Sequence, residues 1–108
     1  MGRALLKAWI SSTNYSFLVI DPLKFNNINR SFNTRVKSFR SLDEIKNIKL
    51  IDAVIIAVKP QVALLVMKNL NKYKFTNKII FLSIVAGKKI NFFNKYLPKK
   101  NQFIRVMP

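Results

Sequence analysis

The sequence of 108 residues contains no cysteine and no histidine, and it has only two glycines and four acidic residues. The absence of cysteine excludes disulfides and a thiol nucleophile, and the absence of histidine excludes an imidazole base. Together these absences exclude the common zinc sites, whose ligands are cysteine and histidine. Serine, lysine and a few carboxylates are therefore the groups left for any chemistry. A hydroxyl such as that of Ser83 has no base to activate it, and we expect it to bond to backbone instead.

Negative charge is scarce, so the net charge reaches +16. Such a balance raises three interpretations: a nucleic-acid or anionic-membrane face, attraction of a phosphorylated small ligand, or a solvated surface of biased composition. The cations are mostly lysines spread along the chain rather than clustered on one helix. The abundance of Lys, Asn, Ile and Phe is also what translation of an AT-rich genome produces. A basic nucleic-acid-binding module remains the alternative function.

Long apolar runs are missing as well. No run approaches the roughly 20 residues that a membrane-spanning helix needs. Lys7 interrupts the short apolar stretch at the amino terminus, so that stretch is no signal peptide. We expect one small, soluble, cytoplasmic domain without a membrane partner.

Residues 51–61, Ile-Asp-Ala-Val-Ile-Ile-Ala-Val-Lys-Pro-Gln, form the segment around which the chain is organised. A short run rich in valine and isoleucine predicts a strand buried on both faces. Pro60 cannot donate to a sheet, but its fixed φ suits the first turn of a helix. Residues 61–71 then have apolar side chains at helical spacing. The segment predicts a strand, a tight loop and a helix, with any ligand site at residues 57–60.

The rest of the chain continues the alternation of strands and helices. We expect strands at 15–20, 34–39, 78–85 and 102–107, and helices at 3–12, 23–33, 42–48 and 88–97. Alternation of this kind predicts βαβ units and a parallel sheet, an α/β fold.

Side-chain patterns suggest how some helices begin and which faces they bury. Ser41 followed by Glu44 is a capping-box pattern for the helix at 42–48. The inward faces are predicted to be Ala4, Leu5, Ala8 and Trp9 in the first helix, and Ile90, Phe93 and Leu97 in the last. Trp9 and the phenylalanines are expected in the core.

Four stretches, read together, resemble the N-terminal, dinucleotide-binding half of pyrroline-5-carboxylate reductase. They are Met-Gly-Arg-Ala-Leu-Leu-Lys at 1–7, Asp-Ala-Val-Ile-Ile-Ala-Val-Lys-Pro-Gln at 52–61, Ser-Ile-Val-Ala-Gly at 83–87 and Ile-Arg-Val-Met-Pro at 104–108. The family implies a Rossmann-like fold and reduction of 1-pyrroline-5-carboxylate to L-proline, in proline biosynthesis. The hydride would come from NADPH or NADH.

The resemblance implies cofactor contacts in several places. The segment Ala57, Val58, Lys59 and Pro60 would border the ribose and nicotinamide end, and Ile84, Val85, Ala86 and Gly87 would form the next wall. Asp21 would accept hydrogen bonds from the adenosine ribose and repel a 2′-phosphate, which favours NADH, although Lys24 nearby offsets this. Met1 and Gly2 stand where the last residues of the family's glycine loop would be. Arg105 is expected to pair with an acid or to lie at the surface.

The family pattern is incomplete in this sequence. Its first strand, most of its Gly-x-Gly-x-x-Gly loop and its C-terminal helical domain for substrate and dimerisation have no counterpart, so we name no catalytic residue. We expect a partial Rossmann-like parallel sheet with flanking helices and with the first, central strand missing. Such a chain should bind dinucleotide weakly and be inactive alone. An alternative is a half-sheet that needs a strand or domain supplied by a partner chain.

Overall fold

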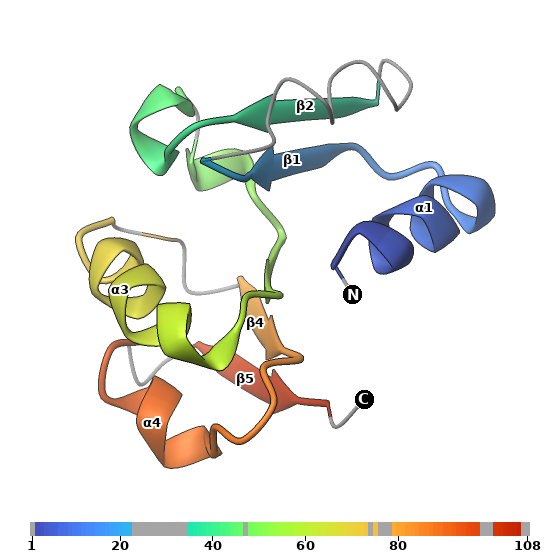
Figure 1. The fold of residues 1–108 in the computed structure, drawn as a ribbon. Helices are drawn as coiled ribbons and strands as arrows, with labels where there is room; N and C mark the ends of the chain where they lie inside the picture. Colours follow the sequence, from blue (N-terminus) through green and yellow to red (C-terminus); the bar gives the residue numbers. More distant parts are fainter. Residues whose placement is uncertain are drawn as a thin grey trace. The chain divides into compact units, whose positions relative to one another are not determined.

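The computed structural model describes residues 2–22, 35–46, 48–73, 75, 79–97 and 101–106. From β3 onward its strands and helices alternate along the chain (Figure 1), and the fold class is α/β with parallel sheets. The described residues group into two compact units, 1–46 and 47–108, where the length alone predicts one domain at most. The predicted helix at 23–33 lies outside the described residues. No helix in the described part of the chain is long and apolar enough to cross a membrane.

The first unit pairs one helix with a two-stranded parallel sheet. Helix α1 spans Gly2–Ser12, and strands β1 (Phe17–Ile20) and β2 (Val36–Phe39) pair in register, Phe17 beside Val36. Leu6 and Val36 are buried in its core, and Ile10, Phe17 and Val19 pack against them. The rings of Trp9 and Phe17 stack at 6.5 Å between centroids. Both predicted strands are therefore confirmed, each a little shorter than expected.

The buried face of α1 agrees only in part with the predicted one. Leu6 is buried and Ile10 is half-buried; of the four predicted residues, Leu5 and Trp9 are half-buried and Ala4 and Ala8 are exposed. The spacing of apolar residues allowed either face, because Ala4, Leu5, Leu6, Ala8, Trp9 and Ile10 nearly encircle the helix. The larger side chains face the sheet, since they remove more apolar surface from water.

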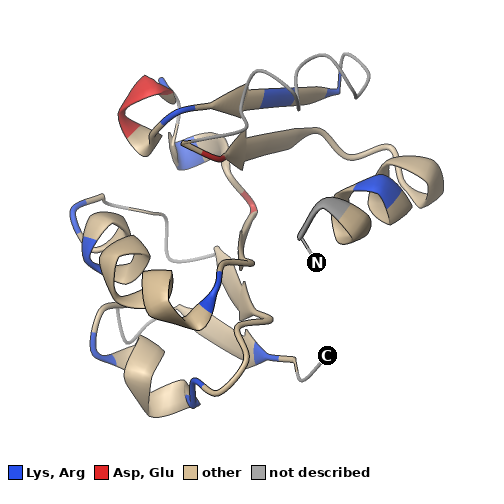
Figure 2. Cartoon of the chain, in the orientation of Figure 1, with Lys and Arg blue, Asp and Glu red and all other residues tan. Residues whose placement is uncertain are grey.

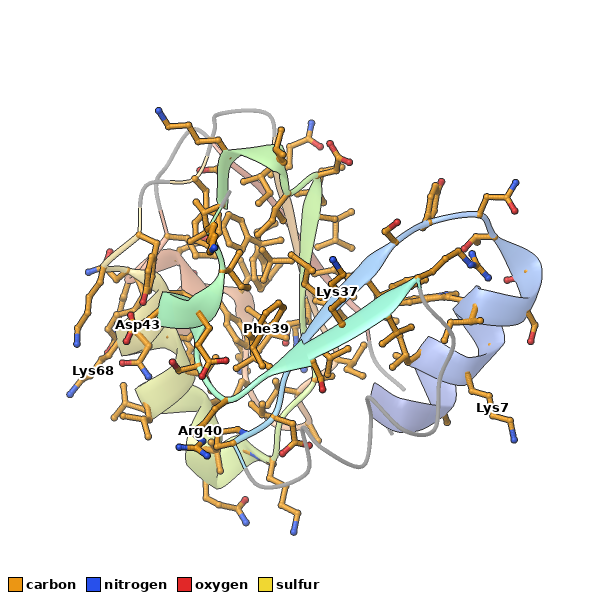
Figure 3. The ribbon with its side chains drawn as sticks, turned by 90° about the horizontal axis from the view of Figure 1, so that it is seen from above. Lys7, Lys37, Phe39, Arg40, Asp43 and Lys68 are labelled. Carbon is orange, nitrogen blue, oxygen red and sulfur yellow. The ribbon has the colours of Figure 1, made fainter. Side chains whose placement is uncertain are left out.

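A single helix over 42–48 was predicted, and that prediction is wrong. Two 3-10 turns occupy this region instead, η1 (Leu42–Glu44) and η2 (Ile48–Leu50), with Asp43 on the first (Figure 3). The side chain of Ser41 makes no capping bond, and Glu44 Oε2 accepts a hydrogen bond from the Arg40 amide at 3.3 Å. The capping pattern thus closes one turn, but Ile45 returns to extended backbone and ends it.

The second unit is a three-stranded parallel sheet with order β3-β4-β5. Strand β3 spans Ala53–Ile56, β4 Ile80–Ser83 and β5 Gln102–Arg105, while helices α3 (Pro60–Leu70) and α4 (Ile90–Asn94) connect them. Both helices lie on the same side of this sheet (Figure 1). The almost fully buried residues of this unit include Ile56, Ala63, Met67, Ile79, Phe81, Ser83, Val85 and Phe93.

Sequence spacing explains how the helices attach. Ala63, Met67 and Leu70 recur at helical spacing and form the buried stripe of α3. In α4, Phe93 is fully buried, and its ring stacks on Phe103 of β5 at 4.8 Å between centroids. The prediction that Ile90 points inward is wrong, since Ile90 is exposed. The described α4 is only five residues long, so it presents one inward position rather than a stripe.

Strand β3 was predicted to be buried on both faces, and this too is wrong. Of its residues Ile56 is buried, Val54 and Ile55 are half-buried and Ala53 is exposed. The described ladders give β3 one neighbour, β4, whereas its apolar composition is typical of a strand whose two faces are both covered. The helices of this unit also cover one face of the sheet and leave the other open within the unit.

Candidate functional site

The carboxyl ends of the three strands of the second unit meet at one edge. Ile56, Ser83 and Arg105 are aligned across the sheet as the last residues of their strands. The ladder continues one step further, because the amide of Ile84 donates to the Ile56 carbonyl at 3.1 Å and that of Val106 to the Ser83 carbonyl at 2.8 Å. The segments that leave β3 and β4, residues 57–60 and 84–87, therefore begin side by side.

The first of these segments is the tight loop that the sequence predicts. Residues 57–59 connect β3 directly to α3, whose first residue is Pro60. Lys59 occupies the N-cap position with extended backbone, and the amide of Val62 donates to its carbonyl at 2.9 Å. Its side chain is exposed and makes no capping bond. The ammonium group is thus available to a ligand at the carboxyl edge.

The second segment is a buried stretch followed by an exposed turn. Ser83 is completely buried, and its Oγ accepts a hydrogen bond from the amide of Val85 at 3.1 Å, which confirms the expected bond of this hydroxyl to backbone. Ile84 and Val85 are buried, whereas Ala86 and Gly87 form an exposed turn. Gly87 has φ of 75°, and an added Cβ would have no neighbour within 4 Å. Glycine is therefore required by the backbone conformation and not by crowding.

Arg105 is fixed by a backbone acceptor and not by an acid, contrary to expectation. Its Nε donates to the carbonyl of Lys88 at 2.6 Å, which ties the end of the second segment to β5. The ammonium group of Lys88 lies 4.7 Å from the centre of the Phe92 ring, a cation–π contact. Nothing in the sequence marks a carbonyl 17 positions away as the partner of this arginine.

The remaining predicted cofactor residues belong to the first unit. Gly2 is the first residue of α1. Asp21 follows β1, is half-buried, and donates its amide hydrogen to the Phe39 carbonyl at 3.1 Å. Met1 lies outside the described residues. Of the predicted cofactor residues, 57–60 and 84–87 therefore share one edge in the second unit, and Gly2 and Asp21 belong to the first unit.

The charge around this edge is positive. Between positions 47 and 108 the only acidic residue is Asp52, which precedes β3 and so lies at the opposite, amino end of the sheet. Lys59, Lys88, Lys89 and Arg105 follow or end the strands at the carboxyl end. Lys and Arg are otherwise distributed over many elements rather than along one helix (Figure 2). The described residues hold no group of three or more acidic side chains placed to bind a metal ion.

Comparison with known protein families, curated proteins and solved structures finds no match. The residues and geometry of the chain itself are therefore the basis for assigning a function.

Proposed function

We propose that this chain provides the nicotinamide-dinucleotide-binding elements of an oxidoreductase of the pyrroline-5-carboxylate reductase type. The observation that most supports this is the shared edge at which residues 57–60 and 84–87 leave adjacent parallel strands. In open α/β sheets, ligands bind at the carboxyl ends of the strands. The two segments that the family resemblance assigns to the cofactor are the two that lie together there.

The arrangement of strands also supports the proposal. In the Rossmann order 3-2-1-4-5-6, removal of the first strand leaves a pair and a triplet of parallel strands. The described strands likewise form a pair, β1-β2, and a triplet, β3-β4-β5, in separate sheets. We therefore propose that the edge of β3 that has no described neighbour is completed by a strand that another segment or another chain supplies.

Binding of the dinucleotide by this sequence alone should be weak. The glycine loop of the family lets the pyrophosphate approach a helix N-terminus closely. The sequence has only two glycines, Gly2 and Gly87, so no Gly-x-Gly pattern is present in it. Contacts from residues 57–60 and 84–87 would remain.

The alternative of a single-strand nucleic-acid module has less support. Such modules stack bases on exposed aromatic side chains that alternate with cations. Among the aromatic residues that the structure describes, Tyr15 is the one that is exposed, and Phe81 and Phe93 are fully buried. Lys88 lies over the half-buried ring of Phe92, but the described residues offer no series of exposed aromatic rings beside the cations of the kind that stacking requires.

Titration with NADH and NADPH, comparing two lysine variants, tests the proposed function. Lys59 and Lys68 are both exposed and lie near opposite ends of α3, Lys68 pointing away from the helix (Figure 3). We expect weak, saturable binding that Lys59→Ala reduces several-fold and that Lys68→Ala leaves unchanged. Equal effects of the two substitutions, or no binding by the unaltered chain at millimolar dinucleotide, would contradict the proposal.

A further inference from the structure

Arg105 is held in place by one bond while most of its donors stay unused. The Nε–H bonds to the Lys88 carbonyl at 2.6 Å, which fixes the plane of the guanidinium. A guanidinium has five N–H donors in a rigid fork. Among the described residues Arg105 makes no other hydrogen bond or ion pair, so both terminal nitrogens keep their donors.

Among the described residues of the second unit, no side-chain carboxylate lies beside this arginine. Its single acid, Asp52, precedes β3, whereas Arg105 ends β5 two strands away. Arg105 is nonetheless half-buried, beside the completely buried Ser83 on the neighbouring strand. A partly buried charge normally has a charged or hydrogen-bonding partner, because losing hydration is unfavourable.

The bond to Lys88 alone does not require an arginine. A neutral amide donor on a side chain of similar reach would satisfy one carbonyl equally well. What arginine adds is the permanent charge and the two outer nitrogens, which match the oxygens of a carboxylate or a phosphate in a bidentate pair. Lys88 and Lys89 raise the local positive potential further, since they follow the turn that this bond anchors.

From these observations we propose that Arg105 is the anchor of an oxyanion-binding site at the carboxyl end of β5. The ligand group is a phosphate or a carboxylate, held by the two terminal nitrogens while Nε stays on the Lys88 carbonyl. This site does not rest on the proposed function, because it needs only Arg105 and its surroundings and no contact of residues 57–60 with a dinucleotide.

The side-chain Nε–H resonance of Arg105 in the full chain, measured by NMR, is the readout for the test. It is compared in sodium phosphate, sodium acetate and sodium chloride at equal ionic strength. We expect a saturable shift of this resonance with phosphate, with acetate or with both, and none with chloride; the salt that acts identifies the oxyanion. Identical responses to all three salts would overturn the proposal, because screening alone would then explain them.

Two variants separate the anion site from the structural bond. Arg105→Gln keeps one donor for the Lys88 carbonyl but loses the positive charge and the two outer nitrogens. The control, Lys95→Gln, removes an exposed cation that directly follows α4. Shifts of the Gly87 amide with oxyanion report binding in either variant. We expect Arg105→Gln to weaken binding by about tenfold or more, the effect of losing a charge-assisted pair, and Lys95→Gln to leave it unchanged. Unaltered affinity in Arg105→Gln would overturn the proposal.

Discussion

Arg35 binds the carbonyl of Ile10 from Nη2 at 2.6 Å, which joins the start of β2 to the last turn of α1. Its Nη1 also donates to the carbonyls of Thr13 and Tyr15, at 2.6 and 3.2 Å. The last carbonyls of a helix have no partner within the helix, and a positive charge there is favourable because of the helix dipole. One side chain therefore determines how α1 ends and where it meets the sheet of the first unit.

Replacing this arginine should loosen α1. We expect Arg35→Ala to destabilise the first unit by about 1–3 kcal/mol, the range for hydrogen bonds to a charged group. Hydrogen exchange of the α1 amides measures the effect, and those near Ile10 should exchange fastest. Lys37→Ala, an exposed residue two positions later on β2 (Figure 3), is the matched control and should leave exchange unchanged. Equal protection of α1 in both variants would contradict this role of Arg35.

Position 87 has room for a side chain, but its backbone conformation is unfavourable for residues other than glycine. A Cβ at this position meets no atom within 4 Å, but φ is 75°. We expect Gly87→Ala to lower the free energy of unfolding of the second unit by about 1–2 kcal/mol, the cost of a left-handed conformation for an L-residue. Gly87→Asn should cost less, because asparagine adopts this region more readily. Urea denaturation measures both, and an alanine variant as stable as the original chain would show that the turn can change conformation.

The edge of β3 that has no partner strand among the described residues should make the chain associate. Residues Asp52 and Ile56 accept hydrogen bonds from β4, so the backbone groups of Ala53 and Ile55, which alternate with them, point to the other side. An apolar edge strand with unpaired backbone groups favours pairing with another chain. We expect the unaltered chain to elute larger than a monomer in size-exclusion chromatography.

Ile55→Lys tests whether β3 is the strand responsible for association. A lysine on an edge strand opposes pairing, since it would have to be desolvated. The variant should elute closer to a monomer. Leu65→Lys, at an exposed position of α3, should elute like the original chain. A monomeric original chain, or identical elution of all three proteins, is incompatible with an open edge at β3.

Local sequence patterns predicted the alternation of elements in the second unit well. The apolar run at 53–58, which ends at Lys59 and Pro60, predicts a strand, a loop and the start of α3 within a few residues. The breaker Gly87 likewise ends the segment after β4 at the expected position. These signals are local, because steric limits on proline and glycine and the period of apolar residues act over a few positions.

Features that depend on neighbours far along the chain were not predictable. The inward face of α1 depends on the sheet it packs against, and the exposure of β3 depends on which strands lie beside it. The bonds from Arg105 to Lys88 and from Arg35 to Ile10 span 17 and 25 positions and end on backbone carbonyls, which every residue carries. Because any residue can supply such a carbonyl, the sequence does not indicate which one a side chain will bind.

An NMR titration of the full chain with NADH, followed through its backbone amides, tests the proposed dinucleotide site. We predict that the largest saturable shifts fall on Ala57, Val58, Lys59, Ala86 and Gly87, with an affinity no tighter than the millimolar range. Shifts confined to other parts of the chain, or none at all at millimolar NADH, would contradict a nicotinamide-dinucleotide site at the carboxyl edge of β3 and β4.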